Sequence, residues 1–167
     1  LRVPVMIDST APAAIEAALK RLAGRSAVNS VHLERGEDAA RRIIALCARY
    51  GAALVCLAID ERGMAMTAAR KVEVATRLRD LALAGGLSDA DLLFDLLTFP
   101  LGSGEESLRG TAVETLDAVR RIKALYPRAF TSLGVSNVSY GLPQAARPYL
   151  NSVFLHYACE AGLDMAI

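Results

Sequence analysis

Four polar side chains, two carboxylates and two amides, follow short apolar runs of this sequence at the point where each run ends. They are Asp8, Asn29, Asp95 and Asn137. A carboxylate accepts hydrogen bonds and an amide both donates and accepts them, so such a set suits one small molecule rich in hydrogen-bonding groups. A fifth run ends at Asp60, but the Glu61-Arg-Gly63 that follows it is equally typical of a turn.

The runs themselves predict buried parallel strands. They occupy residues 3–8, 26–29, 54–60, 92–95 and 132–137, and they are continuously apolar instead of alternating. Segments with helical spacing follow them, near residues 11–23, 38–50, 67–84, 105–125 and 143–160. This order predicts an α/β fold of the (β/α) barrel type, in which residues at the carboxyl ends of the strands face the active-site mouth.

The same alternation of strands and helices runs the whole length of the chain. No linker or low-complexity tract interrupts it, so we expect a single domain over residues 1–167. Five strand-helix units and the start of a sixth strand at Met165 are visible, whereas a closed (β/α)₈ barrel has eight units and typically about 250 residues. We therefore expect a partial barrel that is a fragment of a larger, multidomain chain.

Composition argues against polymeric or membrane partners. The sequence has 19 Lys and Arg residues against 18 Asp and Glu, which gives no field for holding nucleic acid or an anionic membrane. No apolar stretch reaches the roughly 18 residues of a membrane span, and no secretory signal opens the chain. Because Cys47, Cys56 and Cys159 lack CxxC spacing, we expect reduced thiols and a cytoplasmic protein.

Histidines give weaker signals. His156, Cys159 and Glu160 share one helix face in a spacing that metal ligation permits, but the flanking residues are apolar and favour a packed helix. His32 lies beside Glu34 and could act as an acid or base, although a lone histidine near a strand end is more often only hydrogen-bonded. We therefore expect no metal site in this chain.

Seven short stretches carry a resemblance to a known family. They are residues 4–10, 28–31, 34–37, 58–63, 93–95, 134–143 and 151–156, and the most specific contains Gly134-Val-Ser-Asn-Val-Ser139. By these stretches the chain resembles the pterin-binding methyltransferase family, most closely the methyltetrahydrofolate-binding domain of cobalamin-dependent methionine synthase. The resemblance implies a (β/α)₈ TIM barrel of the dihydropteroate synthase-like type, here without its first two strands and most of its last.

The resemblance also implies roles for the strand-terminal residues. Asp8 and Asp95 would accept hydrogen bonds from the pterin nitrogens, and Asn29 would pair with the remaining polar edge. Asn137 would bind the pterin as well and serve catalysis, because its amide oxygen can accept a hydrogen bond from protonated N5. The residues expected to support this set from behind are Ser9, Ser30 and Asp60.

The implied function is to bind 5-methyltetrahydrofolate and to transfer its N5 methyl group to cob(I)alamin in methionine synthesis. Cobalamin would be held by another domain of the same polypeptide, and a zinc ion by a homocysteine module outside this chain. The long loop from Thr98 to Glu106 is the candidate rim for docking the cobalamin-binding domain.

Three alternatives stay open from the sequence. The methyltransferase that serves the corrinoid iron–sulfur protein shares the Ser-Asn-Val-Ser motif. Dihydropteroate synthase would be expected to carry an Asn-Asp pair where this chain has Asn29-Ser30. The third alternative is not an enzyme but an inert barrel fragment kept as a scaffold.

Overall fold

The computed structural model describes residues 3–167 and contains one six-stranded parallel sheet with the order β1-β2-β3-β6-β7-β8. A separate antiparallel hairpin, β4-β5, follows β3. The strands are β1 (Met6–Asp8), β2 (Ala27–Val31), β3 (Ala53–Leu57), β4 (Ile59–Asp60), β5 (Gly63–Met64), β6 (Leu92–Asp95), β7 (Phe130–Leu133) and β8 (Met165–Ala166).

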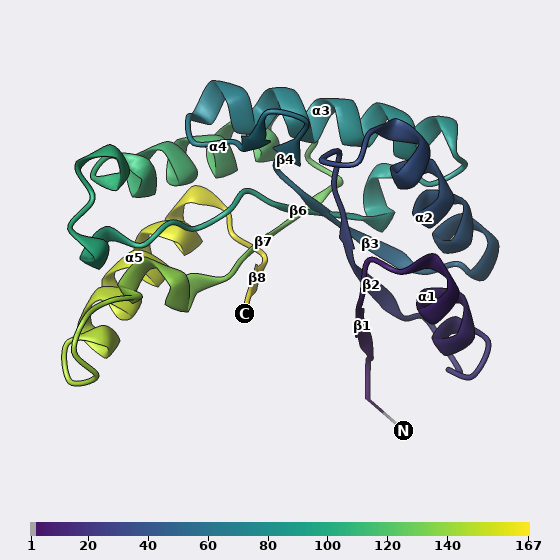
Figure 1. Cartoon of the computed structure of the whole chain (residues 1–167), viewed down its shortest axis with the longest axis horizontal. Coiled ribbons are helices and arrows are strands. Elements are labelled where there is room, and N and C mark those ends of the chain that lie inside the picture. The colour runs from purple at the N-terminus through teal and green to yellow at the C-terminus, as the bar shows by residue number, and fades with distance from the viewer. Residues whose placement is uncertain (1–2) are drawn as a thin grey trace.

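Five α-helices surround the sheet on its outer side. In Figure 1 they form an arc from α1 on the right, over α3 and α4 at the top, to α5 on the left. The helices are α1 (Pro12–Leu19), α2 (Glu37–Tyr50), α3 (Ala68–Ala84), α4 (Thr111–Leu125) and α5 (Arg147–Ala161). Four short 3₁₀ turns lie in the connections: η1 (Asp89–Asp91), η2 (Leu101–Ser103), η3 (Glu106–Leu108) and η4 (Val135–Ser139).

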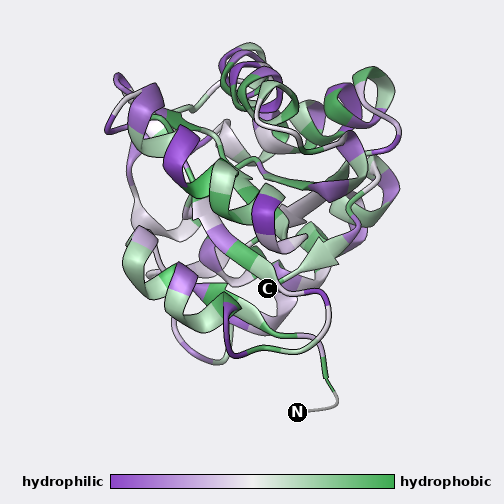
Figure 2. Cartoon of the chain, turned by 90° about the vertical axis from the view of Figure 1, so that its right-hand side faces the viewer, coloured by the Kyte–Doolittle hydropathy of each residue, from purple (hydrophilic) through white to green (hydrophobic). Residues whose placement is uncertain are grey.

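The core lies between the sheet and this arc of helices. Val28, Leu54 and Phe94 from three strands are fully buried, as is Leu78 of α3. Figure 2 shows hydrophobic segments among the strands and mixed hydrophilic and hydrophobic segments along the outer helices. The arrangement is a partial (β/α) barrel and confirms the predicted fold class. No helix among residues 3–167 combines the length and the apolar character that crossing a membrane requires.

Four predicted strands differ in extent from the observed ones. The strand predicted over 3–8 begins at Met6, and the strand predicted over 26–29 continues to Val31. The other two end early. The strand predicted over 54–60 ends at Leu57, because the chain then turns into the β4-β5 hairpin. The strand predicted over 132–137 ends at Leu133, and Asn137 lies in the 3₁₀ turn η4. In both places the apolar composition continues past the strand, because the residues that follow are also buried: Ala58 is 1% exposed and Val138 0%.

Two predicted helices begin later than the sequence indicated. The helix predicted from residue 105 begins at Thr111, since residues 101–108 form the turns η2 and η3. The helix predicted from residue 143 begins at Arg147, after a turn in which the Ala146 N–H donates to the Pro143 carbonyl. The turn at Gly104 has a φ of +80°, a left-handed conformation that suits glycine and cannot continue a helix.

Candidate pterin site

One face of the sheet presents side chains from several strands toward a common space. An apolar cavity of about 270 Å³ lies against it, lined by residues of five strands that include Met6, Ala27, Ala53, Leu93 and Met165. Side chains alternate along a strand, so the residue two positions further on faces the same side. Asp8, Asn29 and Asp95 therefore face this side too, each two positions closer to the carboxyl end of its strand.

The strand register fixes how these residues are spaced. Asp8 pairs with Asn29 on the neighbouring strand. Asp95 pairs with Leu57 of β3 on one side and with Ser132 of β7 on the other. Asn29 and Asp95 are separated only by β3, which places their strands about 10 Å apart, or two strand spacings. A two-ring heterocycle can bridge that span.

Asn137 joins this group from a turn. Together with Asp95 it lines a cavity of about 400 Å³ that is bordered by Leu57, Thr98 and Tyr140 among others. The Asn137 N–H donates to the Gly134 carbonyl, which closes the 3₁₀ turn η4. A Cβ atom added at Gly134 would lie 2.8 Å from the Asn137 amide nitrogen. The glycine thus leaves room for the amide at the cavity wall.

Asp95 is a half-buried carboxylate with few partners. Its Oδ1 accepts a hydrogen bond from the Leu97 N–H at 2.9 Å. Among the ion pairs within residues 3–167, none includes Asp95. Burial raises the pKa of Asp95, and the Leu97 N–H and the positive charge of Lys71 only partly oppose this rise. The carboxylate can therefore still accept hydrogen bonds from a ligand.

Two hydroxyl groups near Asp95 also lack partners. The Ser132 side chain is fully buried at the same register level as Asp95, and its Oγ has no hydrogen-bond partner in the described part of the chain. The same holds for Thr98 Oγ1, and Thr98 lines the cavity that Asp95 and Asn137 share. An unpaired buried hydroxyl is costly, so a polar ligand at this edge would relieve that cost.

Ser9 and Ser30, predicted to support the site, lie beside it in the chain. The Ser9 N–H donates to the Asn29 carbonyl at 2.8 Å and so ties the end of β1 to β2. The Ser9 hydroxyl accepts from the Ala11 N–H at 3.1 Å. Ser30 is buried, whereas Asp8 is exposed. These contacts hold the ends of the first two strands together next to Asp8 and Asn29.

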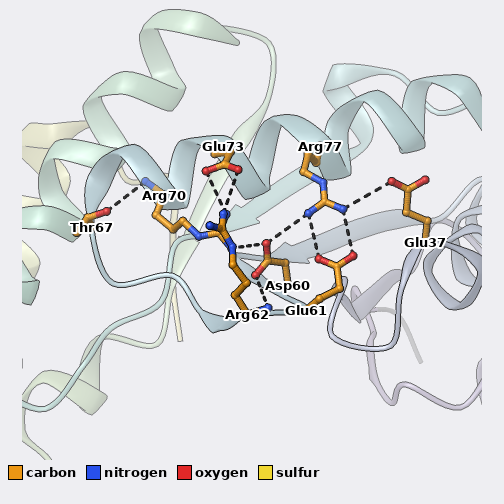
Figure 3. Close-up of polar contacts among 8 residues, drawn as sticks. All are labelled: Glu37, Asp60, Glu61, Arg62, Thr67, Arg70, Glu73 and Arg77. Atoms are coloured by element: carbon orange, nitrogen blue, oxygen red, sulfur yellow. Dashed lines mark hydrogen bonds and ion pairs between the residues drawn. The ribbon is translucent and has the colours of Figure 1, made fainter.

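Asp60, the third predicted supporting residue, belongs to an ion-pair cluster with α3 (Figure 3). Its carboxylate is 1% exposed and accepts from the Arg70 guanidinium, from Arg77 at 3.3 Å and from the Arg62 N–H at 3.0 Å. Burial by itself would raise the pKa of Asp60, but the hydrogen bonds from Arg70 and Arg62 lower it below its usual value. Its contacts thus join the hairpin to α3 and do not reach Asp8, Asn29, Asp95 or Asn137.

Lys71 is a residue near the site that the sequence analysis missed. It is fully buried on α3, and its Nζ lies near the main chain that follows Asp95. A signal was present, because Lys71 shares the inward stripe of α3 with Val74, Ala75 and Leu78 at positions i+3, i+4 and i+7. A lysine on an otherwise apolar stripe indicates a buried amine with a specific task.

Neither histidine lines the cavity that Asp95 and Asn137 share. His156 Nε2 is 3.5 Å from Glu160 on an exposed part of α5, and His32 lies near Glu34 after β2. Within residues 3–167, no three His, Cys, Asp or Glu side chains gather as metal ligands would.

A parallel sheet covered outside by helices, with polar side chains gathered at the carboxyl ends of its strands, defines a barrel of the kind that carries enzyme active sites. The profile of the family described as "Pterin binding enzyme" matches residues 1–167, and the chain belongs to this family. It is 48% identical to methionine synthase of Mycobacterium tuberculosis and 46% identical to that of Mycobacterium leprae, each over 98% of this chain. The chain spans 14% of the length of these relatives.

Solved structures of similar fold include dihydropteroate synthases. The enzyme from Thermus thermophilus, in complex with 6HMPPP, is 23% identical with a TM-score of 0.64 over 98% of this chain and 63% of its own. The enzyme from Stenotrophomonas maltophilia is 19% identical with a TM-score of 0.68 over 99% and 63% of the two chains. At these identities the likeness shows the fold alone.

Proposed function

We propose that this chain binds 5-methyltetrahydrofolate at the carboxyl ends of its strands and takes part in transferring the N5 methyl group to cob(I)alamin in methionine synthesis. Membership in the pterin-binding family and the identity to two methionine synthases support this choice. The observation that carries it is geometric: Asp8, Asn29 and Asp95 face one side at one end of the sheet, and Asn137 shares the cavity of Asp95.

The polar residues suit the edge of a pterin. That edge presents N–H donors beside a carbonyl acceptor, so Asp8 and Asp95 would accept from the nitrogens and the Asn29 amide would serve the remaining group. The Ser132 hydroxyl, which lies level with Asp95, would gain a partner. Each partner that an analogue lacks would leave a desolvated polar group and cost about 1 to 3 kcal/mol.

Asn137 has the chemistry to assist methyl transfer. The methyl group leaves N5 while the electron pair of the broken bond stays on that nitrogen. Unprotonated N5 would therefore leave as an anion, which is a poor leaving group, whereas protonated N5 leaves as a neutral amine. Since an amide does not titrate, Asn137 cannot supply the proton. Its oxygen can accept a hydrogen bond from the N5–H⁺ group and so stabilise the charge that the transition state needs. Cob(I)alamin, when bound, supplies the nucleophile that takes the methyl group.

This assignment implies further parts beyond the barrel. We propose that the barrel is one domain of a longer cytoplasmic polypeptide, in which other domains hold cobalamin and, with a zinc ion, homocysteine. The loop from Thr98 to Glu106 is the proposed rim for the cobalamin-binding domain, and three of its residues, Thr98, Phe99 and Pro100, line the cavity that holds Asp95 and Asn137. The methyl group would thus face the side from which that domain approaches.

Equilibrium binding of 5-methyltetrahydrofolate to the intact protein tests the proposal. Asp95→Asn keeps the size of the side chain and removes the carboxylate. We expect binding weaker by about 10- to 100-fold, the scale of a hydrogen bond to a charged group. Asp80→Asn, a change at an exposed carboxylate of α3, is the control and should bind as the unaltered protein does.

Two outcomes would contradict the proposal. The first is an unaltered protein that does not bind the folate, and the second is an Asp95→Asn variant that binds it normally. Condensation of an aromatic amine with a pyrophosphorylated pterin would instead support the synthase reaction.

A further inference from the structure

Lys71 places an amine in the interior of the protein, behind the candidate site. The side chain is fully buried on the inward face of α3. Burying an amine costs free energy unless its hydrogens are donated to acceptors. The acceptors that Lys71 contacts therefore indicate the role of this residue.

Those contacts converge on the main chain just after Asp95. The Lys71 Nζ donates to the Leu96 carbonyl and, at 3.2 Å, to the Leu97 carbonyl. It also lies 4.8 Å from the centre of the Phe99 ring, a favourable position for a cation. From α4, the Thr115 hydroxyl lies 2.9 Å from the same Leu97 carbonyl and 2.9 Å from the Thr111 carbonyl of its own helix, so these two acceptors share its one hydrogen. Side chains of α3 and α4 thus both contact the Leu97 carbonyl.

Leu97 has an unusual backbone conformation. Its φ is +62°, a left-handed value that is unfavourable for a residue with a branched side chain. In this conformation the Leu97 N–H donates to Asp95 Oδ1 at 2.9 Å. The residue therefore connects Lys71 and Thr115, on its carbonyl side, to the Asp95 carboxylate, on its N–H side.

We propose that Lys71 is a positioning residue for pterin binding: by holding the Leu96 and Leu97 carbonyls, it fixes the left-handed turn whose N–H orients the Asp95 carboxylate toward the ligand. This inference rests on the proposed function, since it assigns Asp95 to the pterin edge. Lys71 acts on the site through the Leu96 and Leu97 carbonyls, the Phe99 ring and the field of its charge.

The charge of Lys71 adds a second effect on Asp95. Burial lowers the pKa of Lys71 to about 7, against the opposing influence of the two carboxylates that face it, Asp95 from β6 and Glu114 from α4. The positive charge of Lys71 in turn opposes the rise that burial causes in the pKa of Asp95. Removing this charge would therefore raise the pKa of Asp95 further, and the carboxylate would become protonated at a higher pH.

The test measures 5-methyltetrahydrofolate affinity as a function of pH in the intact protein. We expect Lys71→Met to weaken binding by about 10-fold, the scale of one lost hydrogen bond to a charged group. We also expect the acid limb of its binding profile to move to higher pH. The methyl-transfer rate constant at saturating folate should change by less than about threefold, because Asn137 and not Asp95 serves N5.

Two further variants separate position from charge and from general destabilisation. Thr115→Val removes a neutral donor to the Leu97 carbonyl, so it should weaken binding by about threefold without moving the acid limb. Lys123→Met is the matched control, because Lys123 Nζ also donates to a main-chain carbonyl, that of Ala129, but before the amino end of β7. It should leave affinity and pH profile unchanged.

The outcomes are distinguishable. A Lys71→Met variant with normal affinity and an unmoved acid limb would overturn the positioning role. If Lys71→Met does not fold, Lys71→Gln, which keeps a donor group and removes the charge, takes its place, and normal affinity with an unmoved acid limb in that variant would overturn the role as well. If Asp95→Asn also binds normally, it is the proposed function that fails and not only the inference about Lys71.

Discussion

Asp60 and Asp95 lie near the carboxyl ends of the neighbouring strands β3 and β6, and the charge of a basic residue of α3 acts on each. Asp60 is 1% exposed and accepts hydrogen bonds from two guanidinium groups and a main-chain N–H. Asp95 is half-buried and accepts one, from the Leu97 N–H. One of the two arginines that pair with Asp60 and the lysine behind Asp95 are consecutive residues, Arg70 and Lys71.

The two carboxylates differ in the sign of their pKa shift. Burial favours the protonated form in both, but the bonds from Arg70 and Arg62 overcome it in Asp60 and lower its pKa, whereas the pKa of Asp95 is raised. A carboxylate that accepts several hydrogen bonds from the protein stabilises the fold, and one with a single protein partner at a cavity keeps acceptor sites for a ligand. The number of partners, more than burial or place in the sequence, separates the two roles.

The largest effect should follow from breaking the Asp60 cluster. Asp60→Ala leaves the partly exposed guanidinium groups of Arg70 and Arg77 without their buried acceptor, so we expect the free energy of unfolding to fall by about 3 kcal/mol. Urea unfolding measures this loss. The affinity of the folded protein for folate should stay within about twofold, because no lost contact reaches the pterin residues. A large loss of affinity with normal stability would reverse the contrast with Asp95.

Asn137 extends the comparison to the residues proposed to bind the pterin. Asn137→Ala should slow methyl transfer by about 10²-fold, the scale of one lost oriented polar contact in a transition state, with a smaller effect on folate affinity. Single-turnover transfer to cob(I)alamin in the intact protein measures the rate constant. Ser136→Ala, at the exposed neighbour in the same turn, is the control. An unchanged rate in Asn137→Ala would remove this residue from the mechanism.

Acid unfolding should separate the two aspartates by sign. The pKa of Asp60 is lowered, so its contribution to stability is present above the unfolded value of 3.8 and is lost as the pH falls through the folded value. The pKa of Asp95 is raised, so it opposes folding above 3.8. Thermal unfolding between pH 2 and 6 should show a weaker loss of stability in acid for Asp60→Asn and a stronger one for Asp95→Asn. The same direction in both variants would contradict the assignment.

The smallest expected effect concerns Ser132. Because its hydroxyl is buried without a partner in the described chain, Ser132→Ala should leave the free energy of unfolding unchanged or slightly higher. Folate binding should weaken by about threefold if the ligand satisfies this hydroxyl. Equal affinity in the two proteins would mean that the pterin edge does not reach β7.

Much of the fold could be predicted because buried parallel strands are continuous apolar runs in the sequence. The apolar runs ending at Asp8, Asn29 and Asp95 are strands, and the strand-terminal rule placed these three residues at one end of the sheet. The rule was wrong for the carboxyl ends of three strands: β2 continues past Asn29 to Val31, and two others end early. The runs ending at Asp60 and Asn137 continue into a hairpin and a 3₁₀ turn that are themselves buried, so composition alone could not show where the strand stops.

The partners of the site residues were harder to predict. The convergence of Lys71, Thr115 and Leu97 joins two helices and a loop, and nothing in the local spacing of any one segment encodes it. The left-handed Leu97 is equally hidden, since a glycine would normally mark such a conformation. The arginine partners of Asp60 are not evident from local spacing either, since they lie 10 and 17 positions further along the chain.

The neighbouring positions of Arg70 and Lys71 on α3 constrain any redesign of this protein. Successive residues of an α-helix point about 100° apart, so one helical turn anchors the hairpin with one side chain and the loop behind Asp95 with the next. A shift or rotation of α3 that changed the Arg70 contact with Asp60 would also change the Lys71 contact with the Leu96 carbonyl. Selection for heat resistance through substitutions around Arg70 would therefore also alter the contacts of Lys71 with the loop that follows Asp95.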